Sequence, residues 1–275
     1  MSLRVRAPAT TANLGAGFDV AGAALELWNE LELVDGRNET DETHLGVRAF
    51  SIFASPVGHS FRFIDRIPRE RGLGSSAAVV ALGLVAGALT AGVRPEAAEL
   101  LAAGLELEGH ADNLAPALAG GVCLTWDGNV ERIADSLPAA PVAVIPEMHV
   151  NTAESRGSLP HSVPHADATY SVARATLLGA ALAGGRAHLF AAAAGDRLHE
   201  PYREANAPHL REIRTKLPRG AIGATLSGSG PTVIVWAEPG EARAVASELA
   251  ERFAEHTVLP LEVSVAGAVD SATRL

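Results

Sequence analysis

A glycine- and serine-rich loop directly precedes the most apolar helical run of the chain, in the stretch "RERGLGSSAAVVALGLVAGALTAG" at residues 69–92. A helix N-terminus carries unpaired N–H groups and a partial positive charge, and Gly72 and Gly74 would allow a ligand to approach the backbone closely. Ser75 and Ser76 could cap the helix and donate hydroxyl hydrogen bonds. The stretch therefore indicates an anion cradle that suits phosphate, although an ordinary capped core helix fits the same residues.

A second chemical signal is a carboxylate on the apolar side of the next helical run, "RPEAAELLAAGLELEG". At 100° per residue, the leucines share one face, and Glu96, Glu99 and Glu106 fall on the opposite one. Glu108 lies near the middle of the apolar face, where a carboxylate must pair or bind a cation. Because Mg²⁺ takes oxygen ligands, Glu108 is a candidate magnesium ligand. The alternative is that this side chain, in the last turn, reaches solvent.

Polar residues also crowd the segment "GHADNLAPALAGG", where His110, Asp112 and Asn113 precede Pro116. A turn with side-chain capping would explain the same residues. A second glycine-serine turn occupies residues 227–230 in "LSGSGPTV". Neither serine cluster matches the G-x-S-x-G elbow of a serine hydrolase, apart from the near miss "GSG", and no HxH or HExxH spacing indicates zinc.

The composition excludes several classes of protein. The formal net charge of −10 leaves no basic stripe for nucleic acid. Lys216 is the single lysine, so a Walker A loop is absent. Cys123 is the single cysteine, which excludes an internal disulfide and fits a reducing cytoplasm. The first residues lack a signal-peptide apolar region, and the apolar run 77–93 is shorter than the ~20 residues of a membrane span.

The candidate site residues must be positioned by mixed strands and helices. Strands are predicted within residues 3–7, 24–34, 59–68, 120–126, 141–147 and 259–267 and on both sides of the 227–230 turn. Helices are predicted after the glycine-serine loop and within 94–109, 168–185, 187–198, 207–218 and 240–256, and residues 35–46 read as an exposed loop. Without strict βαβ alternation or a repeat of solenoid length, this order favours an α+β fold with two lobes.

The motifs occur in the order typical of the GHMP kinase superfamily, and within it the chain is similar to the homoserine kinases. The matching segments are "APATTANLGAGFD", "PRERGLGSSAA", "EGHADNLAPALAGG", "NTAESRGSLP", "GDRLHEPYR" and "LSGSGPTV". Any one of them is a weak signal, whereas all of them in order are highly specific. The resemblance implies a ribosomal S5 domain 2-like N-terminal lobe with the ATP loop, residues 1–145, and a ferredoxin-like C-terminal lobe on the substrate side, residues 146–275.

The resemblance also implies the activity, which is transfer of the ATP γ-phosphoryl group to the hydroxyl of L-homoserine, in threonine biosynthesis. The ATP loop would comprise Pro68, Arg69, Glu70, Arg71, Gly72, Leu73, Gly74, Ser75, Ser76, Ala77 and Ala78. Ser76 and Glu108 would hold Mg²⁺. The amino-acid site would comprise Asn13, Asp19, His110, Asn113, Arg156 and Arg203. Asp19 would pair with the substrate ammonium, the two arginines with its carboxylate, and Asn113 would orient the hydroxyl. The catalytic residues would thus be Asn113, Glu108 and Ser76, with a proton-transfer role for Asp112 left open.

Two departures from the family pattern are visible. Residues 29–68 are fewer than usual, which leaves the adenine contacts open, and Ser171 stands where Asn is common. Two alternatives are a sister GHMP kinase acting on mevalonate or a sugar, and a catalytically silent ligand-binding member. The intact glycine loop and Glu108 disfavour the silent member. We expect no nucleic-acid or membrane partner, and a homodimer by family analogy only.

Overall fold

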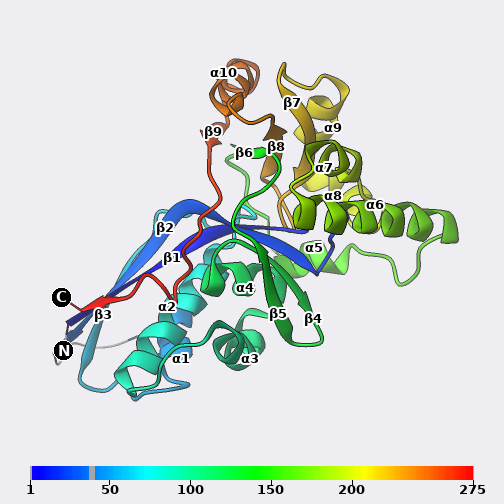
Figure 1. Ribbon diagram of the computed structural model, residues 1–275. Coiled ribbons are helices and arrows are strands. Elements are labelled where there is room, and N and C mark those ends of the chain that lie inside the picture. The colour runs from blue at the N-terminus through cyan, green and yellow to red at the C-terminus, as the bar shows by residue number, and fades with distance from the viewer. Residues whose placement is uncertain (1, 37–40, 151, 275) are drawn as a thin grey trace.

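A computed structural model describes residues 2–36, 41–150 and 152–274 (Figure 1). Its strands are β1 (Ser2–Ala12), β2 (Ala21–Asp35), β3 (His59–Ile64), β4 (Val122–Trp126), β5 (Asn129–Ala134), β6 (Ala140–Ile145), β7 (Ala221–Leu226), β8 (Val233–Ala237), β9 (Thr257–Pro260) and β10 (Thr273–Arg274). Its helices are α1 (Leu45–Phe50), α2 (Ser75–Thr90), α3 (Ala97–Glu108), α4 (Ala111–Ala119), α5 (Thr152–Gly157), α6 (His165–Gly184), α7 (Ala187–Ala193), α8 (Glu200–Arg203), the 3-10 helix η1 (Glu204–Asn206), α9 (Pro208–Thr215) and α10 (Ala242–Arg252).

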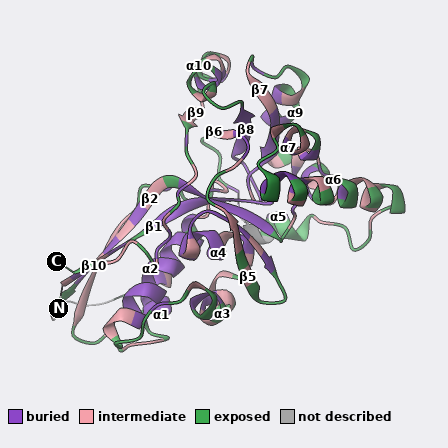
Figure 2. Cartoon of the chain, in the orientation of Figure 1, coloured by how far each residue is buried: buried purple, intermediate pink, exposed green. Residues whose placement is uncertain are grey.

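The first half of the molecule is an antiparallel sheet covered by α1 to α4. Its strand order is β10-β1-β2-β4-β5, and β3 pairs with β2. The long β1–β2 ladder runs from Ser2 opposite Val34 to Ala12 opposite Gly22. Helix α2 lies under this sheet and is buried along nearly its whole length (Figure 2). Its alanines, valines and leucines fill the main core, as expected of a helix that is apolar on every side.

The second half is an antiparallel sheet of order β7-β8-β6-β9. Helices α9 and α10 bury Leu210, Ile213 and Leu249 in one cluster with its strands. Helix α7 belongs to the main core, where the Phe190 ring packs edge-on against Trp236 with centroids 5.0 Å apart. The predicted two-lobed α+β architecture is therefore confirmed.

The predicted lobe boundary at residue 145 stays a prediction, but the sheets divide the chain differently. Strand β6 belongs to the second sheet, although it lies within residues 1–145. The end of the chain returns to the first half, where β10 pairs with β1 and Leu25 bridges to Val263 (Figure 1). Among the described residues, no helix combines the length and the apolar character that a membrane span requires.

The structure rules out the alternative that the polar residues before Pro116 form a capped turn. The segment is helix α4, and Pro116 lies inside it. Proline cannot donate to the carbonyl four residues earlier, that of Asp112. Gly22 of β2 passes beside that carbonyl, since a Cβ at Gly22 would lie 1.9 Å from its oxygen.

Other elements were missed or displaced. Strand β5 and helix α1 were not predicted, and α1 begins inside the expected 35–46 loop, of which residues 37–40 lie outside the described residues. The last predicted strand, within 259–267, instead occupies Thr257–Pro260 as β9.

Candidate active site

A cavity lies where the two halves meet. The cavity is lined by Asn13, Asp19, Glu70, Arg71, Gly72, Gly74, Ser75, Ser76, Glu108, His110, Asp112, Asn113, Arg156, Arg203, Gly228 and Ser229. Every residue predicted for the amino-acid and magnesium sites is in this set. Five residues of the predicted ATP loop are outside it: Pro68, Arg69, Leu73, Ala77 and Ala78. Leu73, Ala77 and Ala78 are instead buried in the core.

The glycines of the 69–74 loop are required by the protein's own packing. Gly74 has a left-handed φ of 64°, and a Cβ there would lie 1.8 Å from Thr10 Oγ1. A Cβ on Gly72 would lie 2.4 Å from the carbonyl oxygen of Ser227 in the second half. The expectation that these glycines only make room for a ligand was therefore incomplete. Gly72 lets the two halves approach each other closely.

The start of α2 differs from the predicted serine cap. Gly74 is the N-cap residue and makes no side-chain cap bond, so Ser75 and Ser76 are the first helical residues. Both line the cavity, together with the helix N-terminus and its unpaired N–H groups. The hydroxyl of Ser76 is directed to Glu108 instead, with Oγ 2.7 Å from Oε2.

Glu108 and Ser76 together form an oxygen-rich corner of the cavity. Glu108 is half-buried, and the alternative that it simply reaches solvent is wrong because it accepts the Ser76 hydrogen bond. Burial raises the pKa of Glu108 to about 7, and the nearby Asp112 adds to the shift. A carboxyl with a raised pKa beside a hydroxyl is a fitting donor set for a hard cation, which would restore its charged form.

Helix α4 brings three polar side chains to the next part of the wall. Asp112 is 4% exposed, and burial, with a smaller effect of Asp19, raises its pKa to about 7. Asn113 Oδ1 accepts a hydrogen bond from Thr10 Oγ1 at 2.7 Å. Burial and the Arg156 charge lower the pKa of His110, so its ring is neutral near pH 7.

The loop between β1 and β2 carries the acidic group of the opposite wall. Both terminal nitrogens of Arg156, on α5, contact the Asp19 carboxylate, and NH1 lies 3.2 Å from Oδ1. Asn13 is 2% exposed and accepts from the Asp19 N–H at 3.1 Å. Its Nδ2 donates to the Gly228 carbonyl at 3.0 Å, so Asn13 ties this loop to the second half.

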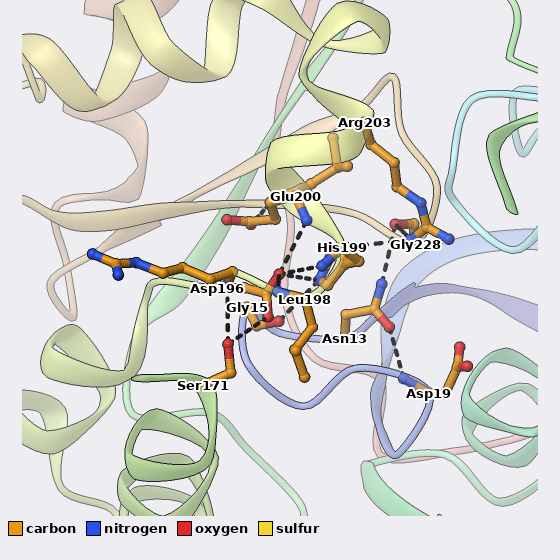
Figure 3. Close-up of polar contacts among 12 residues, drawn as sticks. Asn13, Gly15, Asp19, Ser171, Asp196, Leu198, His199, Glu200, Arg203 and Gly228 are labelled. Carbon is orange, nitrogen blue, oxygen red and sulfur yellow. Dashed lines mark hydrogen bonds and ion pairs between the residues drawn. The ribbon is translucent and has the colours of Figure 1, made fainter. Parts of the chain in front are cut away.

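Arg203 enters the cavity from α8 and is only 3% exposed (Figure 3). Its NH1 lies 3.2 Å from the Gly228 carbonyl oxygen and 3.3 Å from His199 Nδ1. Its Nε is buried and makes no hydrogen bond within the described part of the chain. Because the guanidinium lines the cavity and has five N–H donors, it can still donate to an anionic ligand.

Sequence reasoning missed some lining and supporting residues. Gly228 and Ser229 were predicted only as a turn. Thr10 lies in the first motif, but its role of holding Asn113 was not predicted because that contact spans 103 residues of sequence. The departure at Ser171 is accommodated, since Ser171 Oγ donates to Asp196 Oδ1 at 3.2 Å and accepts from the Arg197 N–H at 3.0 Å.

Comparison with known proteins agrees with the fold and the motifs. Residues 43–121 match the GHMP kinases N terminal domain, and residues 174–255 match the family described as GHMP kinases C terminal. A homoserine kinase of Clavibacter michiganensis subsp. michiganensis is 39% identical over 96% of this chain and 92% of its own length. A homoserine kinase of Streptomyces coelicolor is 40% identical over 86% of this chain and 85% of its own length. In fold, the chain is similar to the crystal structure of homoserine kinase from Cytophaga hutchinsonii, with a TM-score of 0.85, 24% identity, and coverage of 100% of this chain and 97% of that one.

Proposed function

The chain belongs to the homoserine kinase branch of the GHMP kinases, and on that basis we propose that it transfers the γ-phosphoryl group of ATP to the side-chain hydroxyl of L-homoserine. The product is O-phospho-L-homoserine, an intermediate of threonine biosynthesis in the cytoplasm. The observation that carries the substrate choice is the charge pattern of the cavity, in which Asp19 faces Arg156 and Arg203. A zwitterionic amino acid complements that pattern, because its ammonium pairs with a carboxylate and its carboxylate with guanidiniums.

The pairing of Asp19 with Arg156 suggests how the substrate enters. The side chains of both residues are partly exposed, with relative accessibilities of 39% and 44%, so their ion pair contributes only ~0–1 kcal/mol. The zwitterion can replace it with two pairs, ammonium to Asp19 and carboxylate to Arg156. Arg203 binds the same carboxylate from the buried side, and Asn113, held by Thr10, orients the hydroxyl.

The phosphate side of the reaction needs no lysine. The loop 68–78 and the N-terminus of α2 bind the triphosphate through backbone N–H groups and the serines. Ser76 and Glu108 would hold Mg²⁺, which would neutralise phosphate charge. Because phosphoryl transfer has a loose transition state, positioning and charge neutralisation account for most of the catalysis.

A coupled ADP-release assay tests the proposed function. L-Homoserine should be turned over, whereas mevalonate and galactose should not; turnover of either one instead would favour a sister GHMP kinase. The absence of ADP release with all three substrates would favour a silent ligand-binding protein.

The same assay tests the role of Glu108. Glu108→Gln should lower kcat about 10²-fold or more, as expected on loss of a charge-neutralising ligand.

A further inference from the structure

The segment before Arg203 holds two buried polar residues that have no role in the proposed reaction. Asp196 is 6% exposed and His199 is fully buried. Both belong to a connected set of hydrogen bonds that reaches Arg203 (Figure 3). Buried polar groups of this kind cost stability unless their bonds are made, so their contacts show what they hold in place.

Asp196 fixes the short helix that carries Arg203. Its Oδ2 accepts from the N–H groups of Leu198, His199 and Glu200, at 2.9, 2.6 and 3.0 Å. These three bonds fix the bend at residues 197–199 that leads into α8, whose own N-cap residue is His199. Its Oδ1 accepts from Ser171 of α6, so the start of α8 is attached to a long helix.

Glu200 fixes the same helix from another side. Its Oε1 accepts from the Leu226 N–H at 2.9 Å, and its Oε2 accepts from Arg214 at 2.7 Å. Helix α8 is thereby held to β7 and α9. The backbone of Arg203 is therefore well positioned, and only its long side chain still has to be aimed.

His199 contacts both Arg203 and the loop that carries Asp19. Its Nε2 lies 3.1 Å from the carbonyl oxygen of Gly15, which can only accept, so Nε2 carries the hydrogen. Nδ1 is then an acceptor in the neutral ring and lies 3.3 Å from the donor NH1 of Arg203. The ring also stacks on Phe18 with centroids 4.9 Å apart. Each nitrogen therefore has a partner of the matching type.

The surroundings of the ring favour its neutral form. Burial lowers the pKa of His199, whereas the carboxylates of Asp196 and Glu200 and the Gly15 carbonyl act in the opposite direction, and Arg203 lowers the pKa further. A protonated ring would point an Nδ1–H group at the Arg203 guanidinium, so the contact exists only with the neutral ring.

We propose that His199 is a positioning residue whose Nε2–H tautomer aims the Arg203 guanidinium at the α-carboxylate of the amino-acid substrate. The proposal rests on the proposed function, in which Arg203 binds that carboxylate. One ring thereby sets the distance between the 13–19 loop, which carries Asp19, and Arg203. These two elements bind the ammonium and the carboxylate, which an α-amino acid carries on one carbon, so their spacing favours α-amino acids over amino acids whose charges are farther apart.

Two substitutions separate the two contacts of the ring. His199→Asn places an amide near the position of Nδ1 and can keep the Arg203 bond, whereas His199→Gln places one near Nε2 and can keep only the Gly15 bond. We expect His199→Gln to raise KM for L-homoserine about ten-fold, the size of effect of one hydrogen bond to a charged group, with kcat and KM for ATP within about two-fold. His199→Asn should restore most of the wild-type KM.

A substrate analogue and a second histidine provide the controls. With the amino alcohol of homoserine, which has no carboxylate, His199→Gln and wild type should have the same KM. His209→Gln removes another buried imidazole, 6% exposed and packed beside His256 outside the cavity, and should leave KM for homoserine unchanged. Equal KM values for His199→Gln and wild type, or the same rise with the amino alcohol, would overturn the proposal.

The tautomer is measured without turnover, which separates this inference from the proposed function. In ¹⁵N-detected spectra at pH 7.5, the ring signals that disappear in His199→Gln should show a protonated Nε2 and an unprotonated Nδ1. A protonated Nδ1 would overturn the inference even if the enzyme phosphorylates homoserine. If homoserine is not a substrate while the Nε2–H tautomer is present, the proposed function fails and His199 has only the structural contact with Arg203.

Discussion

Asp112 is a buried carboxyl whose ionisation should cost stability. Its pKa in the folded protein is about 7, whereas an unfolded chain has a value near 3.8, so the folded state holds a proton that the unfolded state releases between these values. Stability from this group is therefore present below about pH 4, decreases as the pH rises to about 7, and stays reduced above it.

The isosteric substitution Asp112→Asn tests that balance. It removes the ionisation but keeps an oxygen for the 3.5 Å contact with Asn113 Nδ2. At pH 8 we expect the variant to be more stable than wild type by a few kcal/mol, on the order of the free energy of the pKa shift, and at pH 4 to be equally stable. Thermal unfolding at the two pH values measures the difference. The raised pKa of Asp112 would be contradicted if the variant is less stable than wild type at pH 8. It would also be contradicted if the difference in stability between variant and wild type is the same at pH 8 and pH 4.

The residues of the cavity and its surroundings show which site residues could be predicted from sequence alone. Asp19, Glu108, Arg156 and Arg203 were predicted because they stand in motifs with characteristic spacing, and the structure brings all four to one cavity. Thr10 and His199 lie in two of the same motifs, but no role was predicted for them because their roles arise from tertiary contacts. Nothing in the sequence indicates that Thr10 contacts an asparagine 103 residues away.

At the scale of elements, the start of α2 depends on one glycine. Gly74 combines a left-handed φ of 64° with a site where a Cβ would meet Thr10 Oγ1 at 1.8 Å. Gly74→Ala should destabilise the fold by about 2–4 kcal/mol, of which about 1 kcal/mol is backbone strain and the rest is displacement of Thr10. Displaced Thr10 would also release Asn113, so kcat should fall.

Gly92, just beyond the end of α2, is the matched control. Its φ of 75° would strain an alanine as much as the φ of Gly74 would, but nothing lies within 4 Å of the position that an alanine Cβ would take. Gly92→Ala should therefore cost only the backbone term, about 1 kcal/mol, and leave kcat unchanged. Chemical denaturation of both variants measures the two costs. Equal losses would mean that Thr10 moves aside freely and that the left-handed conformation alone requires Gly74.

Element prediction succeeded where a helix or strand is apolar on its buried side and failed where tertiary contacts override a local signal. The run of α2 was predicted as a core helix, and the structure buries it. A capped turn was the alternative for the segment before Pro116, yet α4 continues through this proline, and Gly22 of β2 packs beside the freed carbonyl of Asp112. That contact spans about 90 residues of sequence, which local propensity does not report.

At the scale of the whole molecule, the halves are joined by the loop that lines the cavity. Ser227 Oγ lies 2.6 Å from the Gly72 carbonyl oxygen, the Thr232 N–H donates to the Arg71 carbonyl at 3.2 Å, and Arg71 Nε donates to the Pro146 carbonyl at 2.9 Å. The 69–74 loop therefore cannot shift without disturbing the second half. Its geometry depends on how the two halves are docked.

The C-terminal segment makes the first half depend on the end of the chain. The Glu26 N–H donates to the Glu262 carbonyl at 2.9 Å, and the Ser264 N–H to that of Ala24 at 3.0 Å. The Ala268 N–H donates to the Ala117 carbonyl of α4 at 2.9 Å. Residues 262–268 thus fill the place beside β2 that β4 leaves open, since β4 pairs only with Ala21, Gly22 and Ala23.

Two truncations test this dependence. A chain ending at residue 270 loses β10, whose ladder with β1 has only two residue pairs, and should lower Tm by a few degrees. A chain ending at residue 260 also loses the backbone hydrogen bonds that residues 262–268 make to β2 and α4, each contributing about 0.5–1.5 kcal/mol, and leaves an open edge on β2, so it should fail to fold cooperatively. Calorimetry and near-UV circular dichroism distinguish the two results.

If the predicted boundary at residue 145 marked an independent first lobe, a fragment 1–145 would fold alone. We expect it to be unfolded, because it lacks residues 262–268 and exposes β6, whose partners β8 and β9 are both missing. A cooperative unfolding transition of that fragment would show that the first half needs neither its returning segment nor the second sheet.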